Sequence, residues 1–202
     1  MKLTIGCTAT GFPLLRSSKP AREPGVRSQE QAMSAVIDQG QLGEEALNRW
    51  LSQSGMSYVA ICQAQETFTP LFSANVKRPD FLVLFESVGL LAVDAKNYSY
   101  SGGVYTLELE AELRRSLAFE RLFRLPLWYA YYDNAAGVES WYWISALKAI
   151  EVGEVRERGR DGMKFLAIRR GDFEHISVAS DLSKLYTHRL PGTARIAASV
   201  IP

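Results

Sequence analysis

Cysteine and histidine are scarce in this chain of 202 residues, which has two of each. The cysteines, Cys7 and Cys62, form no CxxC pair, so we expect neither a zinc site nor a disulfide framework, as in a reducing compartment. The histidines, His175 and His188, have no cysteine or serine partner in the sequence. The GxSxG and HExxH motifs are absent, as are a P-loop and a dinucleotide-binding glycine fingerprint, so the corresponding enzyme classes are not indicated.

Long hydrophobic runs and an excess of either charge are also missing. No apolar stretch is long enough to span a bilayer, and Gly6, Thr8 and Gly11 interrupt any N-terminal signal sequence. We therefore expect a cytoplasmic protein without membrane contact. Lys and Arg total 23 against 22 Asp and Glu, a net charge of +1. This balance excludes a protein that coats nucleic acid by charge alone, so any nucleic-acid binding must come from a local patch.

The composition is that of an ordinary globular protein, with 47% hydrophobic and 22% charged residues. A chain of this length is most simply one domain with its own core. Residues 1–30 are rich in Gly, Pro and Ser and predict an irregular N-terminal arm, and residues 191–202 predict a loose tail. We expect a single domain over residues 31–190.

Residues 77–96, KRPDFLVLFESVGLLAVDAK, contain two short apolar runs separated by Glu86-Ser87. The runs, Phe81–Phe85 and Val88–Val93, have the length and composition of buried strands, and Gly89 suits a tight connection. Asp80 precedes the first run, and Asp94 and Lys96 follow the second. A hairpin would bring its two far ends, Asp80 and Asp94, close together.

The charges at these strand ends predict chemistry. Because side chains alternate along a strand, Asp94 and Lys96 share one face. Buried charges are costly unless they are paired or bind a metal. Two converging carboxylates attract a hard divalent cation, and Lys96 can orient or deprotonate a water, or neutralise a phosphate oxygen. The combination indicates hydrolysis of phosphodiester bonds.

Pro79-Asp80, thirteen intervening residues and Asp94-Ala95-Lys96 together resemble the motif of the PD-(D/E)xK nuclease superfamily. This superfamily includes restriction endonucleases and archaeal Holliday-junction resolvases. The resemblance implies an α/β fold with a restriction-endonuclease-like αβββαβ core, in which helices flank a mixed central sheet. It also implies a DNA endonuclease that uses Mg²⁺, for which Mn²⁺ substitutes. Homodimers and larger repair or mobile-element complexes are compatible with it.

The resemblance assigns roles to individual residues. Asp80 and Asp94 would ligate the metal with the backbone carbonyl of Ala95, and Lys96 would orient the attacking water or stabilise charge. An acid from a helix before the sheet often joins the metal site in this superfamily. We predict a helix over about residues 28–54, in which Glu44 shares the apolar face of Leu47.

Glu45 is the second choice for that acid, because it lies on the polar side of the predicted helix with Asn48 and Arg49. The plain alternative is that Glu44 and Glu45 are both first-turn acids favoured by the helix dipole.

A helix is also predicted over residues 108–124, where leucines recur at helical spacing. In resolvase-like members the helix after the motif supplies a polar or basic residue, for which Arg114 or Arg115 is the candidate by position. Lys77 and Tyr98 flank the motif and are further candidates for contacts with nucleic acid. For each of the four the alternative is a solvated side chain, a local ion pair or, for Tyr98, a turn residue.

The remaining predicted elements are less informative about function. Strands are expected over residues 56–63, 127–133, 140–147 and 163–168, a charged turn over 151–162, and a short helix within 173–186. Trp141 and Trp143 lie in one of these strands and are expected to pack in the core.

Three alternatives to a DNA endonuclease remain open. The first is a nuclease-fold subunit that binds nucleic acid or assembles without turnover. The second is a structural role, in which Asp80 is a turn residue and Asp94 pairs with Lys96 or an arginine. The third is a ribonuclease toxin, which would prefer RNA over DNA.

Overall fold

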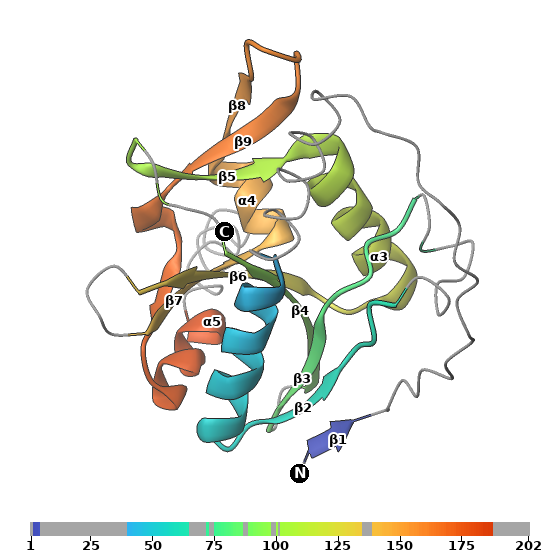
Figure 1. Cartoon of the computed structure of the whole chain (residues 1–202), viewed down its shortest axis with the longest axis vertical. Helices are drawn as coiled ribbons and strands as arrows, with labels where there is room; N and C mark the ends of the chain where they lie inside the picture. Colours follow the sequence, from blue (N-terminus) through green and yellow to red (C-terminus); the bar gives the residue numbers. More distant parts are fainter. Residues whose placement is uncertain are drawn as a thin grey trace, which may run out of the picture.

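A mixed sheet of seven strands forms the centre of the molecule (Figure 1). The computed structural model describes residues 2–4, 40–64, 72, 75–86, 89–97, 100, 102–134 and 139–187. The strands of this sheet, in spatial order, are β1 (Lys2–Thr4), β2 (Ser57–Ala60), β3 (Phe81–Phe85), β4 (Gly89–Lys96), β6 (Leu127–Asp133), β7 (Ser140–Ser145) and β10 (Glu174–Ile176). Only the β1–β2 and β4–β6 pairs are parallel among them.

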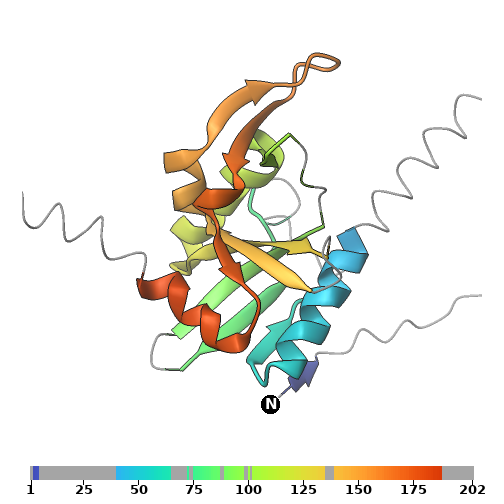
Figure 2. The ribbon, with the colours of Figure 1, turned by 90° about the vertical axis from the view of Figure 1, so that its left-hand side faces the viewer.

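A smaller antiparallel sheet packs beside the central one. It contains β5 (Val104–Glu108), β9 (Lys164–Arg169) and β8 (Glu154–Glu157), in that order. The hairpin of β8 and β9 projects from the body of the molecule (Figure 2). The chain reaches β6 from β4 through β5, a π-helix (Leu109–Arg114) and α3 (Arg115–Phe123). The remaining short helices are α4 (Ala146–Val152), the 3₁₀ helices Arg170–Asp172 and Ala179–Ser183, and α5 (Lys184–Thr187).

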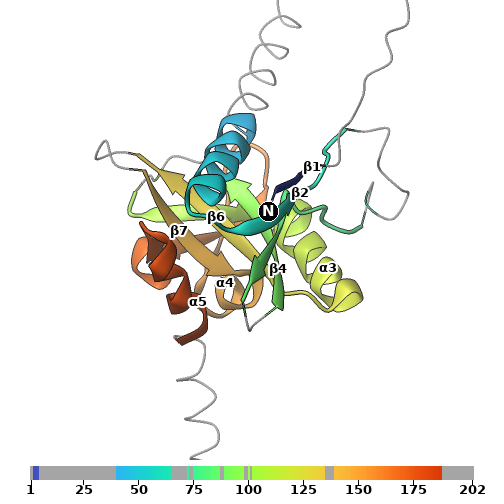
Figure 3. The ribbon, with the colours of Figure 1, turned by 90° about the horizontal axis from the view of Figure 1, so that it is seen from below.

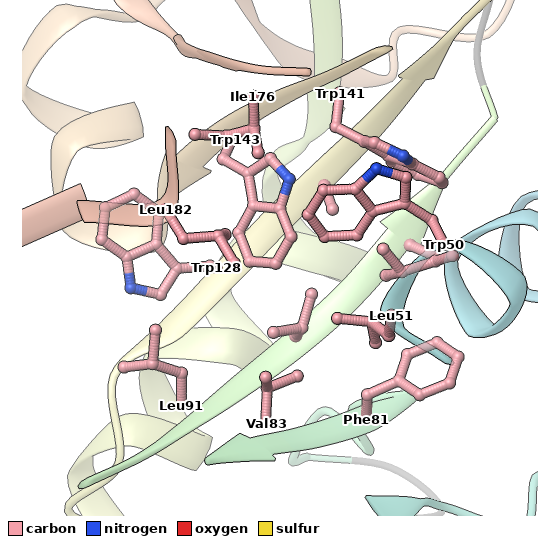
Figure 4. Close-up of a cluster of buried hydrophobic side chains, with 14 of the residues drawn as sticks. Trp50, Leu51, Phe81, Val83, Leu91, Trp128, Trp141, Trp143, Ile176 and Leu182 are labelled. Atoms are coloured by element: carbon pink, nitrogen blue, oxygen red, sulfur yellow. The ribbon is translucent and has the colours of Figure 1, made fainter. Parts of the chain in front are cut away.

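One face of the central sheet is covered by a helix described over residues 40–53. This helix buries Leu47, Trp50 and Leu51 against Phe81 and Trp141 from the strands (Figure 4). The expected core positions of Trp141 and Trp143 are confirmed, because both side chains are fully buried. Burial of side chains this large contributes about 1.5–3 kcal/mol each, so this layer holds the helix firmly on the sheet.

The opposite face of the sheet packs against α3, α4 and the smaller sheet. Ala92 and Tyr129 of the central sheet contact this second core, to which Phe119 of α3 and Leu166 of β9 contribute. The two helices on opposite faces, residues 40–53 and α3, can be followed in Figures 1 and 3. With both faces covered, β4 is a continuous buried strand from Leu91 to Lys96.

The predicted α/β class, with a mixed central sheet flanked by helices, is confirmed. The hairpin of β3 and β4 is confirmed too, with Phe81 opposite Val93. The second strand runs past Val93 through Asp94 to Lys96, and on its other side it pairs with β6. Residues 191–202 lie outside the described residues, as do residues 1–30 apart from β1, which forms a strand within the arm that we expected to be irregular.

Other predicted boundaries were wrong. The helix expected from Glu108 begins one residue later, because Glu108 ends β5 opposite Phe165. The strand predicted over residues 140–147 gives way to α4 at Ala146, where the Ser145 hydroxyl accepts a hydrogen bond from Lys148 N. Cys62 is disulfide-bonded, against the expectation from composition, and its partner lies outside the described residues. No helix in the described part of the chain is long and apolar enough to cross a membrane.

Candidate active site

Asp80 and Asp94 lie next to each other at the open end of the β3–β4 hairpin. The last pair in the ladder is Phe81 with Val93, and Asp80 N then donates a hydrogen bond to Val93 O over 3.0 Å. The Ala95 amide donates to Asp80 Oδ2 over 2.7 Å. Asp80 is 8% exposed and Asp94 1% exposed. The expected convergence of these two carboxyl groups at one buried edge is therefore confirmed.

Two lysines neutralise the Asp94 carboxylate. Lys77 Nζ lies 2.9 Å from Asp94 Oδ1, and Lys96 Nζ lies 2.7 Å from Asp94 Oδ2. Lys96 shares the face of Asp94 because both follow Ala92 at intervals of two, while Val93 and Ala95 belong to the core on the opposite face. This pairing with Lys96 is the one that the structural alternative requires.

Glu112 completes a closed ring of charges with these residues. Its Oε2 atom lies 2.8 Å from Lys77 Nζ and 2.6 Å from Lys96 Nζ. Glu112 was not predicted as a site residue. The one signal for it in the sequence is its position three residues after Leu109, on the apolar side of the helix.

Burial and neighbouring charges shift the pKa values of the two aspartates in opposite directions. Burial raises the pKa of Asp80 well above its ordinary value, and the neighbouring Asp94 and Glu44 raise it further. For Asp94, burial also favours the neutral acid, but the ammonium groups of Lys77 and Lys96 outweigh it and lower its pKa. Asp94 is therefore the acid that stays ionised, and the repulsion between the two acids appears as the raised pKa of Asp80.

The lysines remain cations in this cluster. Burial opposes the charged form of Lys96, but Asp94 and then Glu112 outweigh burial and raise its pKa above the ordinary value. The pKa of Lys77 is also raised, since Asp94 and Glu112 together outweigh burial and the repulsion of Lys96. An ammonium group with a raised pKa is suited to donating hydrogen bonds and neutralising negative charge.

The helix over residues 40–53 brings Glu44 to the same edge of the sheet. A Cβ atom on Gly43 would lie only 2.9 Å from Asn97 Cβ, so a glycine is needed where this helix approaches the end of β4. Glu44 is half-buried, and its pKa is raised first by burial and then by Asp94. Glu45 is exposed on the other side. Of the two glutamates, Glu44 is the one that interacts electrostatically with Asp80 and Asp94.

The predicted contacts to nucleic acid are more scattered. Arg114 is exposed and pairs with Glu110 over 2.8 Å. Arg115 Nη2 donates to the carbonyl of Phe72 over 2.9 Å, which ties α3 to the segment before Lys77. Lys77 is engaged in the ring of charges, and Tyr98 lies outside the described residues.

The two buried carboxylates repel each other, which raises the pKa of one of them, Asp80. Such a pair suits a hard cation that prefers oxygen ligands. Asp80, Asp94 and the Ala95 carbonyl supply this chemistry, with Glu44 in electrostatic reach. In the described parts of the chain, however, no three His, Cys, Asp or Glu side chains are arranged to hold a metal ion. The donor set therefore fits a divalent cation by its chemistry and not as a finished cage.

No family model, no curated protein and no solved structure matches the chain.

Proposed function

We propose that the protein is a metal-dependent endonuclease that hydrolyses phosphodiester bonds in DNA. The observation that carries the proposal is the convergence of Asp80 and Asp94, both buried, beside the Lys96 ammonium group. The succession of elements supports it: a helix, β2, β3, β4, α3 and β6 follow one another, with β4 and β6 parallel. This succession resembles the αβββαβ core of the PD-(D/E)xK superfamily, with β5 and the π-helix inserted.

The cost of the cluster also supports a function. A buried carboxylate whose pKa is raised by a second carboxylate destabilises the folded protein at neutral pH, and a hydrophobic or amide side chain would not. Ionisable groups with perturbed pKa values often cluster at catalytic sites.

Asp80, Asp94, the Ala95 carbonyl and Glu44 would hold the cation, for which Mg²⁺ is the natural choice and Mn²⁺ a substitute. When bound, a cation of this kind polarises the scissile phosphate and lowers the pKa of a water. Lys96, a firm cation, would donate hydrogen bonds to a phosphate oxygen or to the attacking water and stabilise the developing negative charge. Glu112 would keep the Lys96 ammonium group in place.

One observation favours a second candidate, a nuclease-fold subunit that binds nucleic acid without turnover. Lys77 Nζ already occupies the side of Asp94 that a cation would need, 2.9 Å from Oδ1. If the chain is such a subunit, the ring of charges would be a purely structural network, formed by Asp94, Lys77, Lys96 and Glu112. A DNA substrate and a dimeric state belong to the first proposal and would fail with it. A cytoplasmic location does not depend on it, and the disulfide at Cys62 argues against the reducing compartment expected from the composition.

Titration calorimetry with Mn²⁺ separates the two candidates. The endonuclease predicts one site that is lost in Asp94→Asn and weakened in Asp80→Asn. It also predicts tighter binding in Lys77→Met, because the competing ammonium group is gone. Lys148→Met, which removes a lysine from a partly buried pair with Glu174 outside the site, is the matched control. Equal Mn²⁺ binding in all variants, or none in any, favours the subunit without turnover.

A further inference from the structure

A cavity of about 280 Å³ lies beside the ring of charges, between the end of β5 and the turn of the β8–β9 hairpin. Glu112 belongs to both: its carboxylate contacts Lys96 and Lys77, and its side chain also lines the cavity. The other walls come from β5, from β9 and from the turn of the hairpin. The residues that line it include Thr106, Glu108, Arg158, Met163 and Phe165.

The walls of this cavity combine apolar side chains, among them an aromatic ring, with carboxylates. Glu108 ends β5 directly opposite Phe165 of β9, so the carboxyl group and the ring lie on adjacent strands. Met163 adds a polarisable thioether, and Arg158 reaches it with a hydrogen bond of 3.1 Å from Nη2 to Sδ. An aromatic face with a hydrogen-bonding edge is the combination that proteins use for unpaired bases.

A carboxylate selects among the bases, because it only accepts hydrogen bonds. The Watson–Crick edge of guanine offers two adjacent donors, N1–H and the N2 amino group. Thymine and uracil offer one N–H between two carbonyl oxygens, and these oxygens repel a carboxylate. Glu108 therefore favours guanine most and thymine least.

The hairpin beside the cavity carries a small excess of basic residues. Its strands and turn, residues 154–169, contain five lysines and arginines against three acids, a surplus of two where the whole chain has a surplus of one. The basic residues are Arg156, Arg158, Arg160, Lys164 and Arg169, of which Arg156 pairs with Glu154, and Arg158 and Arg160 pair with Asp161. Every residue of β8 is exposed, and the hairpin stands clear of the body (Figure 2). A local surplus of exposed cations is what a nearly neutral chain needs in order to bind nucleic acid.

We propose that this cavity is a nucleotide subsite of the endonuclease, which takes one unpaired guanine of the substrate strand while cations of the β8–β9 hairpin hold the flanking phosphates. The inference rests on the proposed function for its substrate, and it assigns to Glu108 and Phe165 a role that the metal site does not have. Because Glu112 is shared, a base in the cavity would place its own phosphodiester next to Lys96 and Asp94.

The test is binding of nucleotides in EDTA, which needs neither a metal nor cleavage. The probes are dGMP and TMP, followed by a single-stranded (dT)₉ and the same strand with a central dG. We expect dGMP to bind more tightly than TMP, and the strand with dG to bind more tightly than (dT)₉. Glu108→Gln should reduce the affinity for dGMP roughly tenfold, as for loss of a paired hydrogen-bond contact to a base. NMR shifts on addition of dGMP should centre on residues 106–112 and 158–165.

Glu110→Gln is the matched control, since it removes the same charge two residues away at a side chain that is 77% exposed and outside the cavity. Phe165→Ala should weaken all bases alike by removing the stacking surface. Circular dichroism checks that each variant is folded. If Phe165→Ala is unfolded, the result with Glu108→Gln alone decides whether the inference holds. Equal binding of dGMP and TMP, equal binding by Glu108→Gln and wild type, or shifts centred elsewhere would overturn the inference. Failure of the endonuclease proposal would appear separately, as absent Mn²⁺ binding and absent cleavage.

Discussion

Glu112 Oε2 lies 2.6 Å from Lys96 Nζ, although one residue is in a π-helix and the other ends a central strand. Lys96 is thereby held between two carboxylates, with Asp94 on its other side at 2.7 Å. A full π-helix is rare in proteins and often marks a functional position. Here it sets the glutamate against the lysine and leaves the same side chain facing the cavity.

Replacing Glu112 with glutamine tests this relationship. The variant keeps the shape of the side chain but removes one of the two anions that fix the Lys96 ammonium group, so we expect cleavage to fall about 10- to 100-fold, as for lost supporting contacts in metal sites. Steady-state rates on plasmid DNA measure it, with Glu110→Gln as the control on the exposed side of the same helix. An unchanged rate would remove Glu112 from the site.

Asp80→Asn should make the protein more stable in the absence of metal. Asparagine still offers an oxygen to the Ala95 amide, but it removes a carboxylate that is buried beside Asp94 and Glu44. We expect the free energy of unfolding to rise by about 1 kcal/mol, the usual gain when a strained functional residue is relaxed. Urea denaturation in EDTA at pH 7 measures the change.

Asp94→Asn provides the contrast to that variant. It leaves Lys77 and Lys96 facing a neutral group in a buried site, so we expect a loss of about 3 kcal/mol. If Asp80→Asn were as destabilising as Asp94→Asn, the Asp80 carboxylate would be a structural group and the argument from its cost would be wrong.

Asp181 predicts a pH dependence of stability away from the site. The Lys184 ammonium group and then the Ser177 amide lower its pKa from 3.8 to about 2. The lowered pKa means that ionised Asp181 stabilises the fold above pH 3.8 and that this contribution disappears as the pH falls toward 2. We expect Asp181→Asn to cost about 0.5–1 kcal/mol at pH 7, since the group is partly solvated.

Urea denaturation of wild type and Asp181→Asn at pH 7 and at pH 3 measures this difference. The gap between the two proteins should narrow at the lower pH, while the exposed Glu151→Gln, on α4, serves as a control. A gap that stays constant between these pH values would show that the Asp181 charge is not what stabilises the 3₁₀ helix at residues 179–183.

The meeting of Asp80 with Asp94 could be predicted from the sequence because it depends on local pairing. Two apolar runs joined by a short turn form a hairpin, and the hairpin alone brings its ends together. The side that Lys96 shares with Asp94 follows from the alternation of side chains along one strand. Glu44 could be chosen over Glu45 by the same reasoning, applied to the period of a helix.

The smaller sheet and its consequences could not be predicted, because they depend on pairing between distant segments. Val104–Glu108 gains its strand partner only from β9, about sixty residues later. The pattern of leucines from Leu109 onward places Glu112 on the apolar side of a helix but gives no sign of a π-helix, so its contacts with Lys77 and Lys96 could not be predicted. Lys77 was predicted to contact nucleic acid because it is basic and near the motif, whereas its ammonium group lies between Asp94 and Glu112.

Nicking of supercoiled plasmid with Mg²⁺ or Mn²⁺ tests the central claim most directly. Wild type, Asp94→Ala, Lys96→Ala and Lys148→Ala, a control outside the site, are compared, each with and without EDTA. The account predicts metal-dependent nicking by wild type and Lys148→Ala, and a loss of at least about 100-fold in both site variants. Nicking that survives in Asp94→Ala or in EDTA, or a wild type that neither nicks DNA nor binds Mn²⁺, would contradict it.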